Sequence, residues 1–373
     1  MIAHQALSQW IQNSVKTNER TRKRFPGSAR KVCPNCGSRH LLDKIVCPAD
    51  NTLLAPTMSH LALPDLLMKQ LERSAIDNRF VLRSYIGEGA LCWVFDGTQI
   101  EDVMPVAVKV LRHELAADQR TNTRFLSEAR MWQQLTHKNI MRVLDTGMMP
   151  ELQNPSTSDS LIWEDGFSNE RPYIVMEYLR GESLKTVLAH WQLSPELTLR
   201  IAIEVLDALQ WAHKQEIVHR DLKPSNIFLV PDEAGNIHVK VSDFGLAARL
   251  FRQLDWTPQT TKTGSVYGDP SYLSPEYLMD QKTGPQSDIY ALGCIMYQCI
   301  SGKSPFVGQH EFHTLIRHVR DRPDPLTEDL KVPKLLQSAI FKSIEKDPLN
   351  RFSTAVTMQE YLASLATNVY AGK

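Results

Sequence analysis

The chain reads Val218-His219-Arg220-Asp221-Leu222-Lys223-Pro224-Ser225-Asn226 and, after one predicted strand, Val241-Ser242-Asp243-Phe244-Gly245. The two stretches place Asp221, Asn226 and Asp243 in loops. Oxygen ligands of this kind suit Mg²⁺, and a carboxylate can also accept a proton. The sequence therefore supplies three candidate metal or proton ligands.

A glycine-rich turn and a strand lysine lie upstream of these loops. The turn is Ile86-Gly87-Glu88-Gly89-Ala90-Leu91-Cys92-Trp93-Val94, where missing side chains let backbone N–H groups approach phosphate oxygens. Lys109 closes the apolar strand Val106-Ala107-Val108-Lys109. A lysine flanked by buried valines needs an anionic partner, and Glu128 on the following predicted helix is well placed to be one.

In this order along the chain, the motifs resemble those of eukaryotic-type (Hanks-type) protein kinases, in their bacterial serine/threonine branch. The resemblance covers residues 78–368, roughly three quarters of the chain. It implies an α+β, bilobal protein kinase fold with a β-rich N-lobe (78–178) and a helical C-lobe (179–368). Strand patterns in the first half and helical patterns from Glu182 onward agree with two lobes and a cleft.

The resemblance also implies roles for the matching residues. Asp221 would accept the proton of the substrate hydroxyl group. Lys223, in the D-x-K-P-x-N form typical of serine/threonine kinases, would neutralise charge on the transferred phosphoryl group. Lys109 would hold the α and β phosphates of ATP, with Glu128 orienting it.

Two cofactors follow from the same resemblance, ATP and Mg²⁺ (or Mn²⁺). Asn226 and Asp243 would hold two Mg²⁺ ions. Met176 resembles the gatekeeper residue, and Glu177 to Leu179 resemble the hinge whose backbone binds adenine. The implied ATP-binding residues are Ile86, Gly87, Glu88, Gly89, Ala90, Val94, Ala107, Lys109, Met176, Glu177 and Leu179.

Three further residues have structural roles in the resemblance. Ser274-Pro275-Glu276 matches the A-P-E motif, and Arg351 is the expected salt-bridge partner of its glutamate. Residues 218–226 match the catalytic loop of the family, and we use that name for them below. Asp288 would anchor this loop.

The chain departs from the family pattern at two positions. Cys92 stands where a third glycine often lies, and it either fits there as a small residue or acts as a redox switch. Asp269 stands where the family usually carries threonine beside Asp221 and Lys223. A carboxylate there could pair with Lys223, or mimic or oppose charge in the substrate-binding loop.

The segment from Asp243 to Glu276 resembles a kinase activation segment. Arg220, immediately before Asp221, marks kinases whose basic pocket receives an activation-loop phosphate. Thr261 and Thr263 are the first candidates for autophosphorylation and Ser265 the second. The alternative is an ordinary solvated loop.

The first 77 residues contain three predicted parts: a basic flexible tail (1–30), a zinc-ribbon-like module (31–56) and a helical linker (57–77). The tail is a solvated linker or contacts an acidic partner, anionic lipid or nucleic acid. In the linker, helical spacing from Pro64 to Ile76 predicts a short helix.

An internal repeat supports the zinc ribbon, since Val32-Cys33-Pro34-Asn35-Cys36-Gly37 is echoed by Val46-Cys47-Pro48-Ala49-Asp50-Asn51. We expect Cys33, Cys36, Cys47 and Asp50 as zinc ligands, with His40 as the alternative fourth ligand. So short a segment cannot bury enough apolar surface to fold alone, whereas a structural zinc contributes on the order of 10 kcal/mol. The alternative is a loop that has lost the metal and is held by the next domain.

Composition describes an ordinary globular protein of 373 residues, with 42 Lys plus Arg against 42 Asp plus Glu. This balance gives no global electrostatic reason to bind nucleic acid. The chain lacks a recognisable signal peptide and an apolar run long enough to span a membrane, so we expect a cytoplasmic protein. The apolar stretch from Ile289 to Ile300 predicts a buried core helix.

The sequence thus favours an active ATP-dependent serine/threonine protein kinase that acts on Ser or Thr of protein substrates. One alternative is a pseudokinase-like scaffold or adaptor that uses the kinase fold and the zinc ribbon to bind partners. Another is a kinase localised by nucleic-acid binding through the ribbon and tail, although the ribbon has little aromatic content. Relatives commonly form an N-lobe homodimer, which the resemblance extends to this chain.

Overall fold

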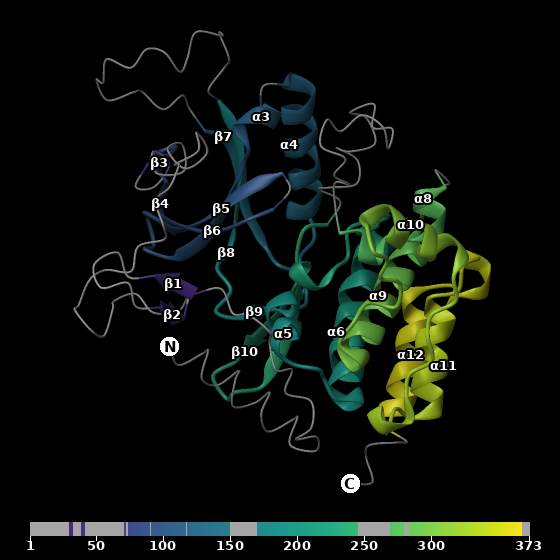
Figure 1. Ribbon diagram of the computed structural model, residues 1–373. Helices are drawn as coiled ribbons and strands as arrows, with labels where there is room; N and C mark the ends of the chain where they lie inside the picture. The colour runs from purple at the N-terminus through teal and green to yellow at the C-terminus, as the bar shows by residue number, and fades with distance from the viewer. Residues whose placement is uncertain are drawn as a thin grey trace.

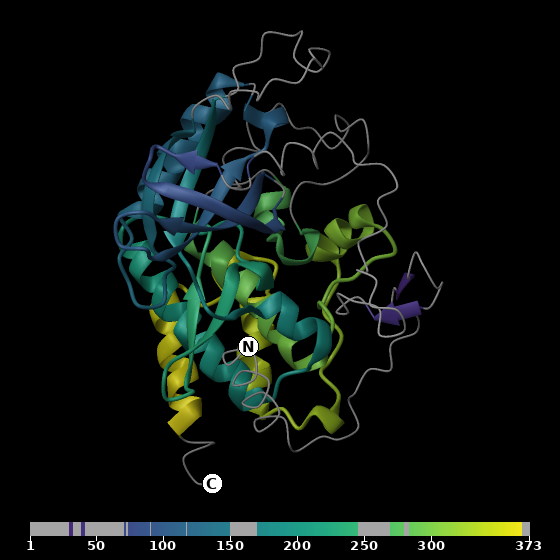
Figure 2. The same ribbon diagram turned by 90° about the vertical axis from the view of Figure 1, so that its left-hand side faces the viewer.

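The computed structural model describes residues 30–32, 39–41, 71, 74–89, 91–116, 118–149, 170–244, 269–279 and 283–367. It has a smaller lobe built on a β-sheet and a larger lobe built mostly of helices (Figure 1). A view turned by 90° shows the same separation of the sheet from the helices (Figure 2). The expected bilobal α+β fold is confirmed.

The N-lobe sheet has, among the described residues, six strands in the order β3-β4-β5-β6-β8-β7, and all neighbours are antiparallel. The strands are β3 (Ala75–Ile76), β4 (Phe80–Glu88), β5 (Cys92–Gln99), β6 (Pro105–Leu111), β7 (Val143–Met149) and β8 (Arg171–Glu177). Successive side chains of a strand point to opposite faces. One face carries a closed apolar core that includes Phe95, Val108 and Tyr173. The other carries Ala107 and Met176, whose apolar cluster continues into the C-lobe.

Helix α4 (Gln119–Gln133) lies beside this sheet and follows the short helix α3 (His113–Ala116) (Figure 1). The Asp118 carboxylate accepts hydrogen bonds from the backbone amides of Arg120 and Thr121 at 3.3 and 3.0 Å. These bonds satisfy amides that lack partners within the helix. The helix buries Phe125, Ala129 and Trp132 at helical spacing, as its amphipathic sequence predicts.

The C-lobe contains α5 (Leu184–His190), α6 (Pro195–Lys214), α8 (Pro275–Leu278), α9 (Pro285–Ser301), α10 (Glu311–Arg320), α11 (Lys334–Ser343) and α12 (Ala355–Leu365). Short 3₁₀ turns are η2 (Pro224–Asn226), η3 (Pro270–Tyr272), η4 (Glu328–Leu330) and η5 (Pro348–Asn350). A small sheet has the order β11-β10-β9, with β9 (Glu182–Ser183), β10 (Ile227–Pro231) and β11 (Ile237–Val241).

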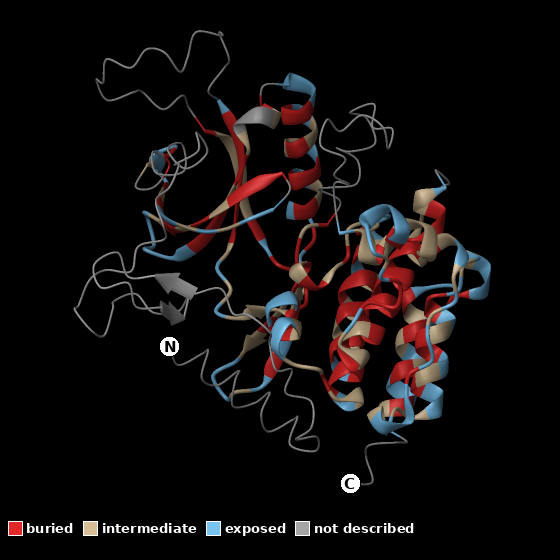
Figure 3. Ribbon diagram, in the orientation of Figure 1, coloured by how far each residue is buried: buried red, intermediate tan, exposed pale blue. Residues whose placement is uncertain are grey.

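Helix α9 is the core helix that the sequence predicts. Nearly every residue from Ser287 to Ile300 is buried, and Figure 3 shows this helix as a continuous buried element among its neighbours. A helix that is covered on all sides belongs to the interior of the lobe. Within the described ranges, no helix is long and apolar enough to cross a bilayer.

The short strands β1 (Arg30–Val32) and β2 (Arg39–Leu41) pair antiparallel, with Val32 opposite Arg39. The pairing brings together the two ends of the segment that contains Cys33 and Cys36. The four predicted zinc ligands themselves lie outside the described residues.

The helix predicted from Pro64 to Ile76 is wrong at its C-terminal end. Leu71 is helical and fully buried, but Ala75–Ile76 is strand β3, paired with the start of β4. Asp77 and Asn78 adopt positive φ values of 50° and 53°, and the Arg79 amide donates to the Ile76 carbonyl at 2.9 Å, so these residues form a tight turn between β3 and β4. This turn and the pairing partner override the local helical spacing, and the N-lobe packing begins before residue 78.

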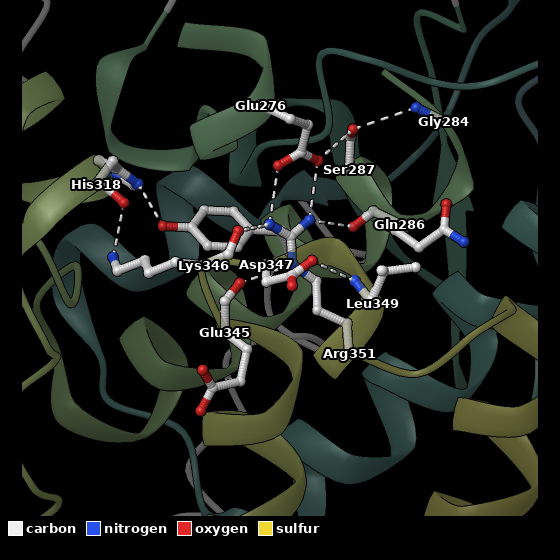
Figure 4. A network of polar contacts seen from close by, with 11 residues as sticks. Glu276, Gly284, Gln286, Ser287, His318, Glu345, Lys346, Asp347, Leu349 and Arg351 are labelled. Carbon is white, nitrogen blue, oxygen red and sulfur yellow. Dashed lines mark hydrogen bonds and ion pairs between the residues drawn. The ribbon is translucent and has the colours of Figure 1, made fainter. Parts of the chain in front are cut away.

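A buried ion pair joins α8 to the turn before α12 (Figure 4). Nη1 and Nη2 of Arg351 donate to the two carboxylate oxygens of Glu276 at 2.9 and 2.8 Å. The other donors reach the backbone carbonyls of Gln286, Lys346 and Glu345. All five guanidinium N–H donors are therefore used, which is the condition for keeping this ion in the interior. The expected Glu276–Arg351 salt bridge is confirmed.

Replacing Arg351 with Met should lower the free energy of unfolding by about 3–5 kcal/mol, because the Glu276 carboxylate would stay buried without its partner. Urea denaturation followed by tryptophan fluorescence measures the change. Arg320→Met is the matched control, since Arg320 is exposed and no described residue pairs with it. Equal stability of the two variants would contradict a structural role for the pair.

Candidate active site

The sheet register brings the predicted ATP-binding residues onto one face of the N-lobe sheet. Gly87 pairs with Val94, and Val94 pairs with Lys109. Ala107, two residues before Lys109, pairs with Met176 on β8. Directly paired residues point to the same face, as do residues two apart in a strand. This is the face whose buried residues continue into the C-lobe core.

The glycine-rich turn leaves free space on this side of the sheet. A Cβ atom built at Gly87 or Gly89 would meet no atom within 4 Å. The turn is closed by the Gly89 amide, which donates to the Cys92 carbonyl at 2.9 Å. Arg112 Nη2 donates to the Gly89 carbonyl at 3.0 Å and to Glu88 at 2.8 Å. The turn is thus held by its own backbone and by Arg112, and protein atoms do not fill the space over its glycines.

Lys109 connects this sheet to the loop after β11. Its Nζ forms an ion pair with the Asp243 carboxylate and lies 5.9 Å from the centre of the Trp132 ring. The expected pair between Lys109 and Glu128 is not formed in the structure. Asp243 is the carboxylate within reach of the ammonium group, while Glu128 is buried on α4 with 2% exposure. An ammonium group in a partly buried site takes the nearest opposite charge.

The catalytic loop is anchored from below by Asp288 of helix α9, as predicted. Asp288 is 1% exposed, and its carboxylate accepts the backbone amides of His219 and Arg220, both at 2.9 Å. His213 Nε2 lies 2.7 Å from the same carboxylate. Burial alone would raise the pKa of Asp288, but the bonds from His213 and the backbone outweigh it and hold the pKa below its usual value. Arg220 adopts a φ of 63°, a conformation that these bonds keep in place.

Three predicted residues converge within the loop. Lys223 Nζ donates to Asp221 Oδ2 at 2.7 Å. Asn226 Nδ2 donates to the Asp221 backbone carbonyl at 2.9 Å. Burial lowers the pKa of Lys223, but the carboxylates of Asp221, Asp243 and Asp269 together raise it by more, so the net shift is upward and the lysine stays charged. No donor among the described residues contacts Asp221 Oδ1.

Asp243 lies next to this group. It has a φ of 66°, and the preceding Ser242 amide donates to the Asn226 carbonyl at 2.9 Å. The His219 ring bonds the Ser242 carbonyl at 2.9 Å and lies 4.6 Å from the centre of the Phe244 ring. Asn226 and Asp243 therefore come from two adjoining backbone segments. Their amide and carboxylate oxygens are hard ligands that fit a divalent cation such as Mg²⁺.

The side chain of the hinge residue Glu177 is engaged within the protein, which is compatible with the expected role of the hinge backbone. Its Oε1 accepts from Lys240 Nζ and from the Arg142 amide, both at 2.8 Å. The side chain therefore links β8 with β11 and the start of β7, and only the hinge backbone remains to contact a base. Of the other predicted ATP-binding residues, Met176 is buried, Ile86 is half-exposed, Leu179 packs against the C-lobe cluster, and Ala90 lies outside the described residues.

Asp269 is exposed and begins η3. Its Oδ1 accepts the Ser271 amide at 3.0 Å, and it forms no ion pair with Lys223 or any other described residue. The pairing with Lys223 considered from the sequence is therefore not formed. Thr261, Thr263 and Ser265 lie outside the described residues.

Sequence reasoning missed three residues that support the site: Arg112, His213 and Lys240. Arg112 directly follows β6, so its closeness to the glycine-rich turn follows only from the pairing of β5 with β6. His213 and Lys240 act through partners far away in the sequence, at Asp288 and Glu177. The spacing of motifs does not report such contacts.

Cys92 is buried beside the glycine-rich turn with 7% exposure. Burial raises the pKa of its thiol to about 12, with Lys109 opposing the shift. The thiolate is the reactive form of cysteine, and it is scarce at neutral pH under these conditions. Of the two interpretations of Cys92, the geometry favours a small residue that simply fits at this position, and it disfavours a redox switch.

The sequence was compared with models of known protein families. A sequence model of the family described as "Protein kinase domain" matches residues 80–363. The chain belongs to the protein kinase domain family.

Curated relatives of the chain are named as serine/threonine-protein kinases. A probable serine/threonine-protein kinase of Corynebacterium efficiens is 36% identical over 299 residues, covering 79% of this chain and 42% of that protein. Serine/threonine-protein kinase pkn3 of Myxococcus xanthus is 33% identical over 291 residues, covering 77% and 50%. Serine/threonine-protein kinase PknB of Mycobacterium tuberculosis is 33% identical over 290 residues, covering 77% and 42%. The chain thus spans half or less of the length of these relatives.

Solved structures agree on the fold. The crystal structure of the Mycobacterium tuberculosis PknI kinase domain matches with a TM-score of 0.54 and 21% identity, covering 79% of this chain and 98% of that one. A cysteine-to-alanine variant of the same domain matches with a TM-score of 0.56. At this identity the likeness supports the kinase fold alone.

Cys92 in the native protein should resist both iodoacetamide and mild peroxide, because its thiol is buried and protonated. Mass spectrometry of the peptide after timed exposure at pH 7.5 measures the modified fraction, which should stay below about a tenth of that in urea-unfolded protein. The unfolded sample is the control for reagent reactivity. Rapid oxidation of Cys92 in the native state would restore the redox-switch interpretation.

Proposed function

We propose that this chain is an ATP-dependent serine/threonine protein kinase that transfers the γ-phosphoryl group of ATP to Ser or Thr hydroxyls of proteins. One observation carries the proposal: Asp221, Lys223 and Asn226 meet in one loop, beside the Asp243 that pairs with Lys109 of the other lobe. The family match and the names of the curated relatives support it.

Asp221 is positioned in this proposal to accept the proton of the substrate hydroxyl. Its Oδ2 is held by Lys223, while its Oδ1 is left without a described donor. As the hydroxyl oxygen bonds to the γ-phosphorus, the bond to the β–γ bridging oxygen breaks and the proton passes to Asp221. Lys223 then lies close enough to offset charge on the moving phosphoryl group.

Lys109 would contact the α and β phosphates, and Asn226 and Asp243 would hold the divalent cations. Mg²⁺ bound with ATP would neutralise charge on the phosphates. The free space over Gly87 and Gly89 suits the approach of phosphate groups to the turn, and Arg112 keeps the turn in position. Glu128 remains a candidate for orienting Lys109 once Asp243 is engaged elsewhere.

Regulation by autophosphorylation on Thr261 or Thr263, with Ser265 as a second choice, belongs to the same proposal. It rests on the sequence of the activation segment and on Arg220, whose backbone is fixed by Asp288 next to the catalytic aspartate. An N-lobe homodimer, common among such kinases, would let one copy phosphorylate another.

Wild-type protein incubated with Mg-ATP should phosphorylate itself and generic substrates such as casein. Asp221→Asn should lower the transfer rate by about 10²–10⁴-fold, because the amide keeps the shape but does not accept the proton. Radiolabel transfer and mass-spectrometric mapping measure both the rate and the modified residues. ATP binding by calorimetry should be similar for both proteins, which controls for folding. Wild-type protein that binds ATP but transfers nothing would favour the scaffold alternative.

The N-terminal segment is proposed to be a zinc ribbon that serves docking or regulation. The antiparallel pairing of β1 and β2 supports this, because it brings the ends of the Cys33 to Cys36 segment together as a metal-binding turn requires. Cys47 and Asp50 of the repeat would complete four ligands. The zinc would provide the folding free energy that so few residues lack.

Purified protein should contain about one zinc ion per chain by elemental analysis, since a closed four-ligand site holds zinc tightly. Cys33→Ser should lose most of it, whereas Cys299→Ala in the C-lobe should keep it. Asp50→Ala and His40→Ala, compared in the same way, identify the fourth ligand. A zinc-free wild-type protein would mean that the loop is held without metal.

A further inference from the structure

A pocket opens beside the predicted catalytic pair. Its lining includes Asp221, Lys223, Asp269, Tyr272, Leu273 and Tyr277. A substrate hydroxyl that reaches Asp221 must bring its neighbouring residues past this lining. The charges of the pocket therefore bear on which substrates fit.

Asp269 is the carboxylate of this pocket that is open to a ligand. It is exposed, and only its Oδ1 is used, by the Ser271 amide at 3.0 Å. Among the described residues, nothing donates to its Oδ2. The third acid of the lining, Asp288, is buried and occupied by His213 and two backbone amides.

The cations of the pocket leave the charge of Asp269 in place. Lys223 pairs with Asp221 at 2.7 Å, and the Asp269 carboxylate forms no ion pair among the described residues, although its charge also helps to raise the pKa of Lys223. The pocket lining thus holds one aspartate in an ion pair, Asp221, and one exposed aspartate without an ion pair among the described residues, Asp269. The family motif usually has threonine here, which has no charge, so this selectivity would be a property of this chain.

We propose that Asp269 is a specificity-determining residue that selects protein substrates with Lys or Arg within two positions of the phosphorylated Ser or Thr. The proposal rests on the proposed kinase function. A cationic side chain would pair with the free carboxylate oxygen, whereas Asp or Glu at the same position would be repelled. Because Asp269 is exposed, the effect should be modest and should weaken as salt is added.

The test compares peptides that differ only in Lys, Gln or Glu at each position from two before to two after the acceptor serine. For each enzyme we would measure the ratio of kcat/KM for the Lys peptide to that for the Gln peptide. Wild type should show a ratio between about two and five at one or more positions. Asp269→Asn keeps an oxygen that can accept the Ser271 amide but removes the charge, so its ratio should fall to about one. Asp269→Glu keeps the charge and should retain a ratio above one.

Each outcome decides the question, because the ratio cancels any general loss of activity in a variant. A wild-type ratio of about one at every position, or an unchanged ratio in Asp269→Asn, overturns the proposal while leaving the kinase function intact. A ratio that persists at 0.5 M salt also contradicts it. If wild type phosphorylates no peptide and not itself, the kinase function fails and the specificity with it.

Discussion

One buried carboxylate holds the candidate active site in shape. Asp288 lies on a helix that is covered on all sides, so its position is fixed by the C-lobe core. A carboxylate in that environment must be saturated with hydrogen bonds, and those of Asp288 come from the His213 ring and from the amides of His219 and Arg220. The same bonds also constrain the loop, because they hold the backbone of Arg220 at a positive φ that this residue would otherwise avoid. The position of the catalytic loop is therefore tied to that of the core helix.

A second buried anion lies next to the first and serves the other wall of the pocket. Ser287, the neighbour of Asp288, donates to Glu276 at 2.6 Å, and Glu276 in turn is paired with Arg351. The N-terminal turn of α9 thus anchors the catalytic loop through one residue and α8 through the next. Since α8 follows the loop that begins at Asp269, contacts with the single helix α9 position both walls of this pocket. Their relative position depends little on the N-lobe.

The sequence was sufficient for the parts of the fold and site that depend on local pattern. The strands, helix α4, the core helix α9, and the Asp288 and Glu276–Arg351 contacts follow from periodicity and from the resemblance to kinases. It failed where a contact depends on three-dimensional position. The helical spacing before Ile76 gave way to a hairpin turn, and the spacing of the motifs did not indicate that Lys109 pairs with Asp243, which lies 134 residues later in the sequence. The contacts of Arg112, His213 and Lys240 were missed for the same reason.

In the proposed function, the charged residues of the cleft that take part in phosphoryl transfer differ from the one that selects substrates. Lys109 pairs with Asp243 and Lys223 with Asp221, so each lysine offsets an aspartate to which the proposed function gives a role in phosphoryl transfer. These paired groups are close to neutral together and would treat most acceptor sequences alike. Asp269 adds one further negative charge at the edge, outside both pairs. A substrate would sense that charge through its flanking residues and not through the reacting hydroxyl. The position can therefore change during evolution without loss of the catalytic group, which is consistent with its departure from the family pattern.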